Sequence, residues 1–265
     1  MTARKRVLVI VPFPFGEQGL ANRAAQSDGF SDTVEFVYRG VKAGPTLFDS
    51  NHDLLIADVA IFEAGMRAEE EGFDAVCIDT TSDSGLWALR SVLDIPVIGP
   101  GRASIALALT LGDRFSVVSL WAPWELAVRK GLKDSGLEAK CASVRWVDGY
   151  EPDVENLTAG KEDEWFPKLL EVAQRCIDED GAHVILMAST TMHQAHSYLA
   201  ERLPVPVLNP GPVSYHLVES VLAMNLTHSR AAYRRGTLDK PDLLAAMLDA
   251  GNAHERSVGR ITDDA

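Results

Sequence analysis

The chain has 265 residues, of which 46% are hydrophobic and 24% are charged, a composition typical of a globular protein with a sizeable core. Its 25 basic and 38 acidic residues give a net charge of −13, which repels phosphate backbones and anionic lipid. We therefore expect no nucleic-acid partner and no membrane binding. Three cysteines without metal-ligand spacing, and an N-terminal apolar run (Val7–Val11) too short for a signal peptide, predict a cytoplasmic protein.

Strand and helix patterns alternate along the chain. Short apolar runs predict strands at Val7–Val11, Thr33–Tyr38, Ala75–Asp79, Pro96–Ile98, Phe115–Ser119, Ala142–Val147, Val184–Ala188 and Pro206–Leu208. Longer patterns predict helices at Asp53–Glu71, Ser84–Leu93, Ser104–Leu111, Trp124–Ser135, Lys161–Glu179, His193–Arg202 and Val213–Leu226, and from about Pro241. Fully apolar strands are buried on both faces, so the alternation predicts an α/β fold with parallel sheets.

The sequence also repeats itself at an offset of 108 to 110 residues. Ile95–Gly101 resembles Val205–Gly211, and the strand that ends at Val11 matches the one that ends at Ser119. Similar landmarks in the same order predict two similar α/β lobes, related by a pseudo-twofold axis, with the active site in the cleft between them. We assign residues 1–100 and 213–265 to the first lobe and residues 101–212 to the second.

Two polar triplets follow equivalent strands of this repeat, Thr80-Thr81-Ser82 and Ser189-Thr190-Thr191. Ligands of parallel sheets bind beyond the carboxyl ends of the strands, so the triplets are expected to line the cleft from opposite sides. If each triplet opens a helix, its free backbone N–H groups and hydroxyls would form a cradle for a carboxylate or an oxyanion. The alternative is that these hydroxyls only cap helices.

Two residues are candidates for proton transfer. Asp79 ends a strand beside the first triplet and is a candidate base, since burial would raise its pKa. The alternative is a structural carboxylate that caps the next helix or meets Arg90 or Arg102. His193 lies in the first turn after the second triplet and is within reach of the cleft.

Aromatic residues recur at duplicated positions after the strands. Phe13, Phe15, Trp121 and Trp124 are candidates for an apolar wall of the pocket, with core packing as the alternative. No metal is expected, because the acidic and histidine residues of segment 49–53 lack a fourth ligand at a usable spacing. The pair of glycines at 99 and 101 lacks the rest of a dinucleotide fingerprint, so no nucleotide cofactor is expected.

Several segments together resemble the aspartate/glutamate/hydantoin racemase superfamily. They are Ile78–Leu86, Ile95–Gly99, Leu111–Ser119 and Gly181–Ser189, besides the N-terminal strand that runs into Pro12. The resemblance covers most of the chain. It is strongest to hydantoin racemases, with arylmalonate decarboxylase and maleate isomerase as related enzymes. It implies an enzyme that uses no organic cofactor and forms homo-oligomers.

The chain departs from the racemase pattern at the catalytic positions. Racemases of this family carry one cysteine after each duplicated strand, and Thr80 and Ser189 occupy those positions here. The three cysteines of the chain lie elsewhere and are expected to be small buried residues. A hydroxyl does not shuttle protons at neutral pH without a neighbouring base, so the cysteine mechanism is not expected. Thr81 and Ser82 match a pair that holds a carboxylate in arylmalonate decarboxylase.

The prediction is thus a racemase- or isomerase-type enzyme that acts on a small carboxylate or a hydantoin-like cyclic amide. The reaction would pass through an enolate-like intermediate that the two polar triplets stabilise. One alternative is a hydrolase or lyase that opens a cyclic amide, imide or lactone, with Ser189 or Thr80 as nucleophile. The others are a decarboxylase and a non-catalytic carboxylate-binding protein.

Overall fold

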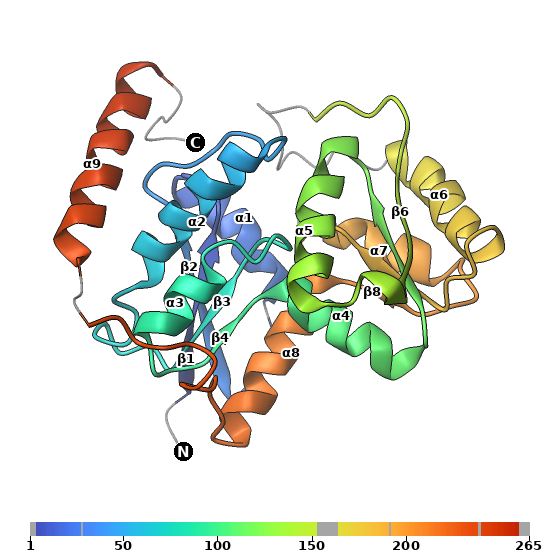
Figure 1. Ribbon diagram of the computed structural model, residues 1–265. Helices are drawn as coiled ribbons and strands as arrows, with labels where there is room; N and C mark the ends of the chain where they lie inside the picture. The colour runs from blue at the N-terminus through green and yellow to red at the C-terminus, as the bar shows by residue number, and fades with distance from the viewer. Residues whose placement is uncertain (1–3, 28, 153–163, 191, 238–239, 260–265) are drawn as a thin grey trace.

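Eight strands form two parallel sheets in the computed structural model, which describes residues 4–27, 29–152, 164–190, 192–237 and 240–259 (Figure 1). The first sheet has the order β2-β1-β3-β4 and the second the order β6-β5-β7-β8. All the strand pairs are parallel. The strands are β1 (Lys5–Val11), β2 (Val34–Gly40), β3 (Ala75–Ile78), β4 (Val97–Ile98), β5 (Phe115–Ser119), β6 (Cys141–Trp146), β7 (Val184–Met187) and β8 (Val207–Leu208).

The same strand order in both sheets confirms the predicted α/β class and the two similar lobes. Each predicted strand is present, with ends that differ from the prediction by no more than two residues. The helices are α1 (Glu17–Ala24), α2 (Asn51–Gly65), α3 (Leu86–Val92), α4 (Pro100–Leu111), α5 (Glu125–Ser135), α6 (Phe166–Asp178), α7 (His193–Ala200), α8 (Pro210–Ala223) and α9 (Pro241–Ser257).

Each sheet is covered on both faces, as its apolar strands require. In the first lobe, α2, α3 and α9 pack on one face around Leu8, Ile10 and Ile78. The other face packs against α8 through Tyr215 and Val218. In the second lobe, α6 and α7 cover one face, and α4 and α5 cover the other.

The helices that follow the last strand of each sheet are exchanged between the lobes. α4 follows β4 of the first sheet but packs through Ile105 and Ala108 against β5 and β7 of the second. α8 follows β8 of the second sheet but packs through Tyr215 and Val218 against the first. The two exchanged helices also pack against each other. Both helices begin at the carboxyl end of the strand before them and extend downward from the middle of the molecule (Figure 1).

Several helices differ from the sequence prediction. α4 begins four residues before the predicted Ser104, and α8 lies three residues earlier at each end than predicted. The predicted start of α6 at Lys161 lies outside the described residues.

Residues 17–24 form α1, which was not predicted, because this polar segment has no apolar stripe. The predicted helix at Asp53–Glu71 ends at Gly65, where a Cβ atom would lie 2.5 Å from Ile10 Cδ1. The chain continues in turns that lead to Gly72, whose φ of +79° suits glycine.

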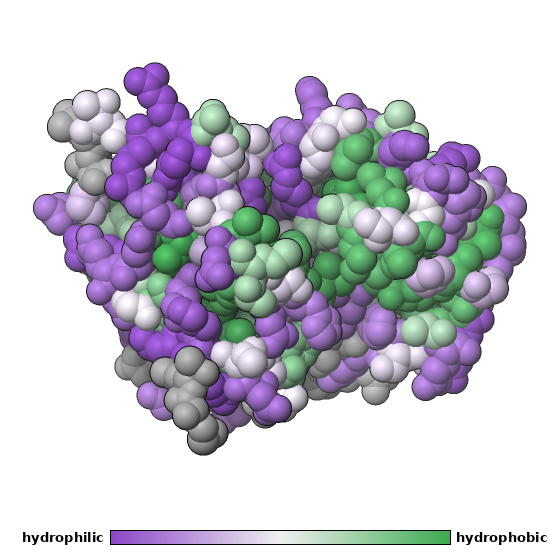
Figure 2. All heavy atoms as spheres, turned by 90° about the horizontal axis from the view of Figure 1, so that it is seen from below, coloured by the Kyte–Doolittle hydropathy of each residue, from purple (hydrophilic) through white to green (hydrophobic). Residues whose placement is uncertain are grey.

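Apolar side chains are exposed on the lower face of the molecule, and they are most extensive on the side of the second lobe (Figure 2). On α4, Leu107 and Leu111 are 36% and 49% exposed. Within the described ranges, no helix is long and apolar enough to span a membrane.

Candidate active site

A pocket of about 830 Å³, which includes space open to solvent, lies between the lobes at the carboxyl ends of the strands. Loops of both lobes contribute to it. The residues that line it are Pro12, Phe13, Phe15, Thr46, Leu47, Phe48, Asp79, Thr80, Thr81, Ser119, Leu120, Trp121, Trp124, Tyr150, Pro152, Ser189, Thr190 and Met192. Ligands of open parallel sheets bind at this end, which makes the pocket the candidate active site.

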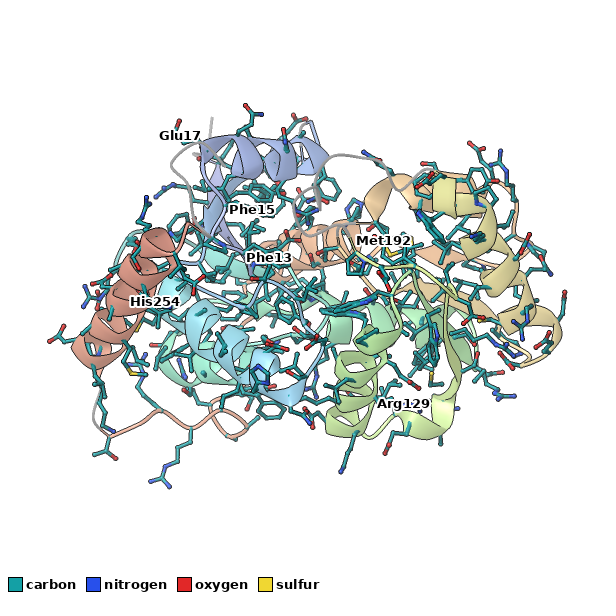
Figure 3. All side chains as sticks on the ribbon, turned by 90° about the horizontal axis from the view of Figure 1, so that it is seen from above. Phe13, Phe15, Glu17, Arg129, Met192 and His254 are labelled. Carbon is teal, nitrogen blue, oxygen red and sulfur yellow. The ribbon has the colours of Figure 1, made fainter. Side chains whose placement is uncertain are left out.

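Aromatic rings form much of the pocket wall. Phe13 stacks on Phe15 at a ring-centroid distance of 5.4 Å and meets Phe48 edge-on at 5.7 Å. Phe48 in turn contacts Trp124 edge-on at 5.4 Å. Phe13 and Phe15 extend from the first lobe toward the middle of the molecule, where Met192 of the second lobe also lies (Figure 3). The wall suits a ligand with an apolar or aromatic face.

Thr80 and Ser189, the first residues of the two polar triplets, both line this pocket. They come from opposite lobes, at the ends of β3 and β7, and are 109 residues apart, as the repeat requires. Thr80 is buried, and its hydroxyl lies 3.1 Å from the Ser82 hydroxyl, which lies 3.0 Å from that of Ser84. Ser82 is not among the lining residues and stands behind Thr80.

Thr81 and Thr190 form a reciprocal pair of hydrogen bonds between the lobes. The Thr81 hydroxyl donates to the carbonyl oxygen of Ala188, and the Thr190 hydroxyl donates to that of Asp79 at 3.0 Å. The donors and the acceptors are both 109 residues apart, so the same bond is made twice about the pseudo-twofold axis. The Trp124 indole N–H also donates to the Ala188 carbonyl, at 2.5 Å.

Asp79 forms a buried ion pair with Arg23 of α1. The Arg23 Nη2 atom lies 2.8 Å from Asp79 Oδ1, and its Nε atom lies 3.0 Å from Oδ2. The Arg23 side chain is 6% exposed and that of Asp79 is 2% exposed. Both carboxylate oxygens of Asp79 thus accept from one guanidinium. Burial opposes the charge on Arg23, but the carboxylate of Asp79 outweighs it and raises the guanidinium's pKa.

The predicted alternative partners of Asp79 are wrong. Arg90 donates to the Val97 carbonyl oxygen and to the Tyr233 hydroxyl, and the backbone N–H of Arg102 donates to Asp83. Arg23 was missed as the partner, because the sequence pattern predicts no element at residues 17–24. A carboxylate at the end of a buried strand requires a buried partner of opposite charge. This requirement was the only indication in the sequence that Asp79 has such a partner.

The expected helix N-terminus at the first triplet is also absent. α3 begins only at Leu86, after a turn in which the Asp83 N–H donates to the Thr80 carbonyl oxygen. The nearest helix N-terminus is that of α4, where Asp83 accepts from the N–H groups of Gly101 and Arg102 at 2.9 and 2.7 Å. A protein carboxylate therefore occupies the anion site, and the first triplet does not form a carboxylate cradle with a helix.

Two candidates fall outside the described part of the molecule. Thr191 is one, and the side chain of His193, the first residue of α7, is the other. In the segment considered for a metal, the His52 ring lies 3.2 Å from Asp53 at the exposed start of α2, outside the pocket. Among the described residues, no three His, Cys, Asp or Glu side chains are grouped to hold a metal ion.

The three cysteines are structural residues, as predicted. Cys77 and Cys176 are buried, and Cys141 is partly buried, and none of them lines the pocket. Burial raises the pKa of all three thiols, that of Cys141 to about 11. Raised pKa values keep these thiols protonated and unreactive at neutral pH.

The fold agrees with comparisons to known proteins. The model of the Asp/Glu/hydantoin racemase family matches residues 19–218. A hydantoin racemase of Pseudomonas sp. (strain NS671) is 32% identical over 212 residues, which is 78% of this chain and 81% of the relative. Allantoin racemase from Klebsiella pneumoniae has 25% identity and a TM-score of 0.79 over 89% of this chain and 95% of that one. Unliganded arylmalonate decarboxylase, at 18% identity, 82% and 91% coverage and a TM-score of 0.58, shares the fold.

The chain belongs to the Asp/Glu/hydantoin racemase family. On that ground it is an enzyme of the racemase and isomerase class.

Proposed function

We propose that this enzyme moves a proton at an acidic carbon of a small, neutral, hydantoin-like cyclic amide and thereby racemises or isomerises it. The reaction requires no cofactor and passes through an enolate-like intermediate. The observation that carries the proposal is the pair Thr80 and Ser189, which line one pocket from two lobes related by a pseudo-twofold axis. Two hydroxyls that reach one pocket from opposite lobes are suited to stabilise the enolate-like intermediate that both enantiomers share.

The charge of the pocket favours a neutral amide over a carboxylate. No lysine, arginine or histidine is among the described lining residues, and their one carboxylate, Asp79, is paired with Arg23. Burying an anion without a partner is costly, whereas the aromatic rings suit a flat amide ring with an apolar substituent. The curated relatives that match this chain are named hydantoin racemases, which supports the same substrate class.

The proton carrier is a separate part of the proposal. Asp79, His193 and water were the candidates from the sequence, and the Arg23 ion pair occupies both oxygens of Asp79. We assign the transfer to His193 or a water molecule, with the Thr80 and Ser189 hydroxyls as hydrogen-bond partners of the developing oxyanion. If His193 carries the proton, His193→Asn lowers kcat at least tenfold, whereas loss of an unrelated surface histidine, His254→Asn, leaves it unchanged. An unchanged kcat in His193→Asn would assign the transfer to water.

The direct test is proton NMR in heavy water with each enantiomer of 5-benzylhydantoin, with allantoin as a polar comparison and the enzyme-free rate subtracted. We expect exchange of the ring C–H and loss of optical activity. Thr80→Val and Ser189→Ala should each slow the exchange of both enantiomers at least tenfold, because both hydroxyls stabilise the intermediate that the enantiomers share. Thr110→Val and Ser197→Ala, both outside the pocket, are the matched controls.

Other outcomes would replace the proposal. Ring opening without C–H exchange would indicate a hydrolase with Ser189 or Thr80 as nucleophile. Release of CO2 from an arylmalonate would indicate a decarboxylase. Thermal stabilisation by a hydantoin without turnover would indicate a binding protein.

The assembly and location of the enzyme remain part of the proposal. We propose a homo-oligomer in the cytoplasm, in keeping with the family and with the exposed leucines of α4. Light scattering coupled to size-exclusion chromatography tests the oligomeric state, and a strictly monomeric mass would refute the homo-oligomer.

A further inference from the structure

We propose that Thr81, Thr190 and Arg23 form a latch between the lobes that fixes the position of Thr80 relative to Ser189. They act as positioning residues, and none of them reacts with the substrate. The effect of the latch on turnover rests on the proposed function, whereas its effect on the coupling of the lobes does not.

The first observation is that Thr80 and Ser189 each lie at the centre of a tripeptide that is hydrogen-bonded to the other lobe. Thr80 lies between Asp79, whose carbonyl accepts from Thr190, and Thr81, whose hydroxyl donates to Ala188. Ser189 has the same arrangement, because Ala188 and Thr190 are its two neighbours. Each tripeptide is therefore bonded to the opposite lobe on both sides of its central residue, and neither centre can shift without breaking one of these bonds.

The second observation is the buried cation behind the tripeptides. Arg23 binds the carboxylate of Asp79 in its own lobe and lies 3.4 Å from the Thr190 carbonyl oxygen of the other lobe through both Nη atoms. One guanidinium thus contacts Asp79 at the end of β3 in the first lobe and Thr190 in the loop after β7 in the second. Removal of this cation would leave the buried Asp79 carboxylate without a partner.

The third observation is an asymmetry in an otherwise symmetric device. Trp124 donates to the Ala188 carbonyl and lies 3.2 Å from the Thr81 hydroxyl, so it reinforces one of the two threonine bonds. The equivalent position in the first lobe, at the offset of 108 residues that relates Val11 to Ser119, is Gly16, which has no side chain, and Arg23 reinforces the side of the other bond. The two sides of the latch are thus supported by different chemistry, an indole on one and an ion pair on the other.

The latch gives the hydroxyls of Thr81 and Thr190 a role besides contact with the ligand, because each donates to a backbone carbonyl of the opposite lobe. A displacement of about 1 Å in a reacting group can cost a hundredfold in rate, so a fixed spacing of Thr80 and Ser189 serves kcat. The aromatic walls, which bind the ligand, stand on other loops. Loss of one latch bond should therefore lower kcat more than it raises KM.

The experiment compares Thr81→Val and Thr190→Val with Thr81→Ser and Thr190→Ser, which keep the hydroxyl. With 5-benzylhydantoin, each valine variant should lose at least tenfold in kcat with KM changed less than twofold, and each serine variant should recover most of kcat. The valine double variant should lose less than the product of the single losses, since the two bonds act as one unit. An equal loss of kcat in the valine and serine variants, or a rise in KM with kcat unchanged, would overturn the proposal.

A second readout does not depend on turnover. Amide hydrogen exchange measured by mass spectrometry should rise in Thr81→Val not only around residue 81 but also at residues 186–190 of the opposite lobe, and not in Thr81→Ser. Arg23→Lys, which keeps the charge and loses the bidentate contact, should raise exchange in both segments. An increase confined to the mutated lobe would refute the latch even if the wild type turned over no hydantoin. A wild type without turnover, but with exchange changes in both lobes, would refute the proposed function alone.

Discussion

Asp83 carries a pH dependence that belongs to the stability of the fold. Burial raises its pKa to about 6, although the N–H groups of Arg102 and Gly101 lower it. The folded state therefore binds this proton more tightly than the unfolded chain. The contribution of Asp83 to stability is thus most favourable at acid pH and is lost as the pH rises toward 6.

The Asp83→Asn variant isolates this effect, because it keeps an oxygen that can accept from α4 and removes the titration. From pH 7 to pH 4.5, the wild type should gain about 2 kcal/mol of unfolding free energy relative to the variant. Urea unfolding at both pH values measures the difference. If the difference in unfolding free energy between the wild type and the variant stays constant with pH, or favours the variant at acid pH, Asp83 does not titrate as described.

At the residue scale, the sequence predicted which residues line the pocket better than it predicted which residues they bond to. Thr80, Ser189 and the aromatic residues were found, because the repeat and the strand ends place them by chain order alone. Arg23 was missed, because a buried ion pair between residues 56 apart depends on packing that no local pattern carries. The roles of Thr81 and Thr190 depend likewise on how closely the two lobes approach.

At the scale of the element, α4 begins unusually close to the turn that carries Thr81. A Cβ atom on Gly101 would lie 2.2 Å from the Thr81 carbonyl oxygen, whereas one on Gly131 of α5 would meet nothing within 4 Å. Gly101→Ala should lower the unfolding free energy by about 2 kcal/mol or more, because backbone must move. Gly131→Ala should raise it by about 0.5–1 kcal/mol, since alanine favours helix. Thermal denaturation of the two variants gives the comparison, and shifts of the same sign would contradict the close approach of Thr81 to α4.

The last helix, α9, is held by few contacts. Leu248 is its buried residue, and Asp249 and Asn252 bond to Lys42 at 2.6 Å each. Leu248→Ala should cost about 2 kcal/mol. Met247→Ala, at a position 53% exposed, should change stability by less than about 0.5 kcal/mol. Equal effects in urea unfolding would mean that α9 does not dock through Leu248.

The elements themselves were predictable to different degrees. Buried parallel strands were found because their apolar runs are continuous. The end of α2 was not, because residues that favour helix continue in the sequence beyond Gly65. The existence of α1 was not, because tertiary packing of a polar segment decides it. The turn from Thr80 to Gly85 replaced an expected helix start, because Asp83 is drawn to the amides of α4.

At the scale of the molecule, the net charge of −13 gives a test of substrate class. A neutral hydantoin should show a KM that changes less than twofold between about 20 and 300 mM salt, since it carries no charge for the ions to screen. A carboxylate substrate should bind better as salt rises, because screening weakens its repulsion by the protein. Measurement of KM for hydantoins and arylmalonates across this range distinguishes the two, and a strong salt dependence for the neutral compound would count against the pocket as described.

The exchange of α4 and α8 between the sheets has a consequence for the origin of the molecule. The helix that follows the last strand of each sheet packs on the other sheet, so a single ancestral lobe would have left one face of its sheet only partly covered. Two copies of such a lobe, each lending its last helix to the other, would have formed a closed twofold dimer by domain swapping. Fusion of the two genes would preserve that arrangement and free the halves to diverge. Phe13 in the first lobe and Trp121 at the matching pocket position of the second fit such a divergence.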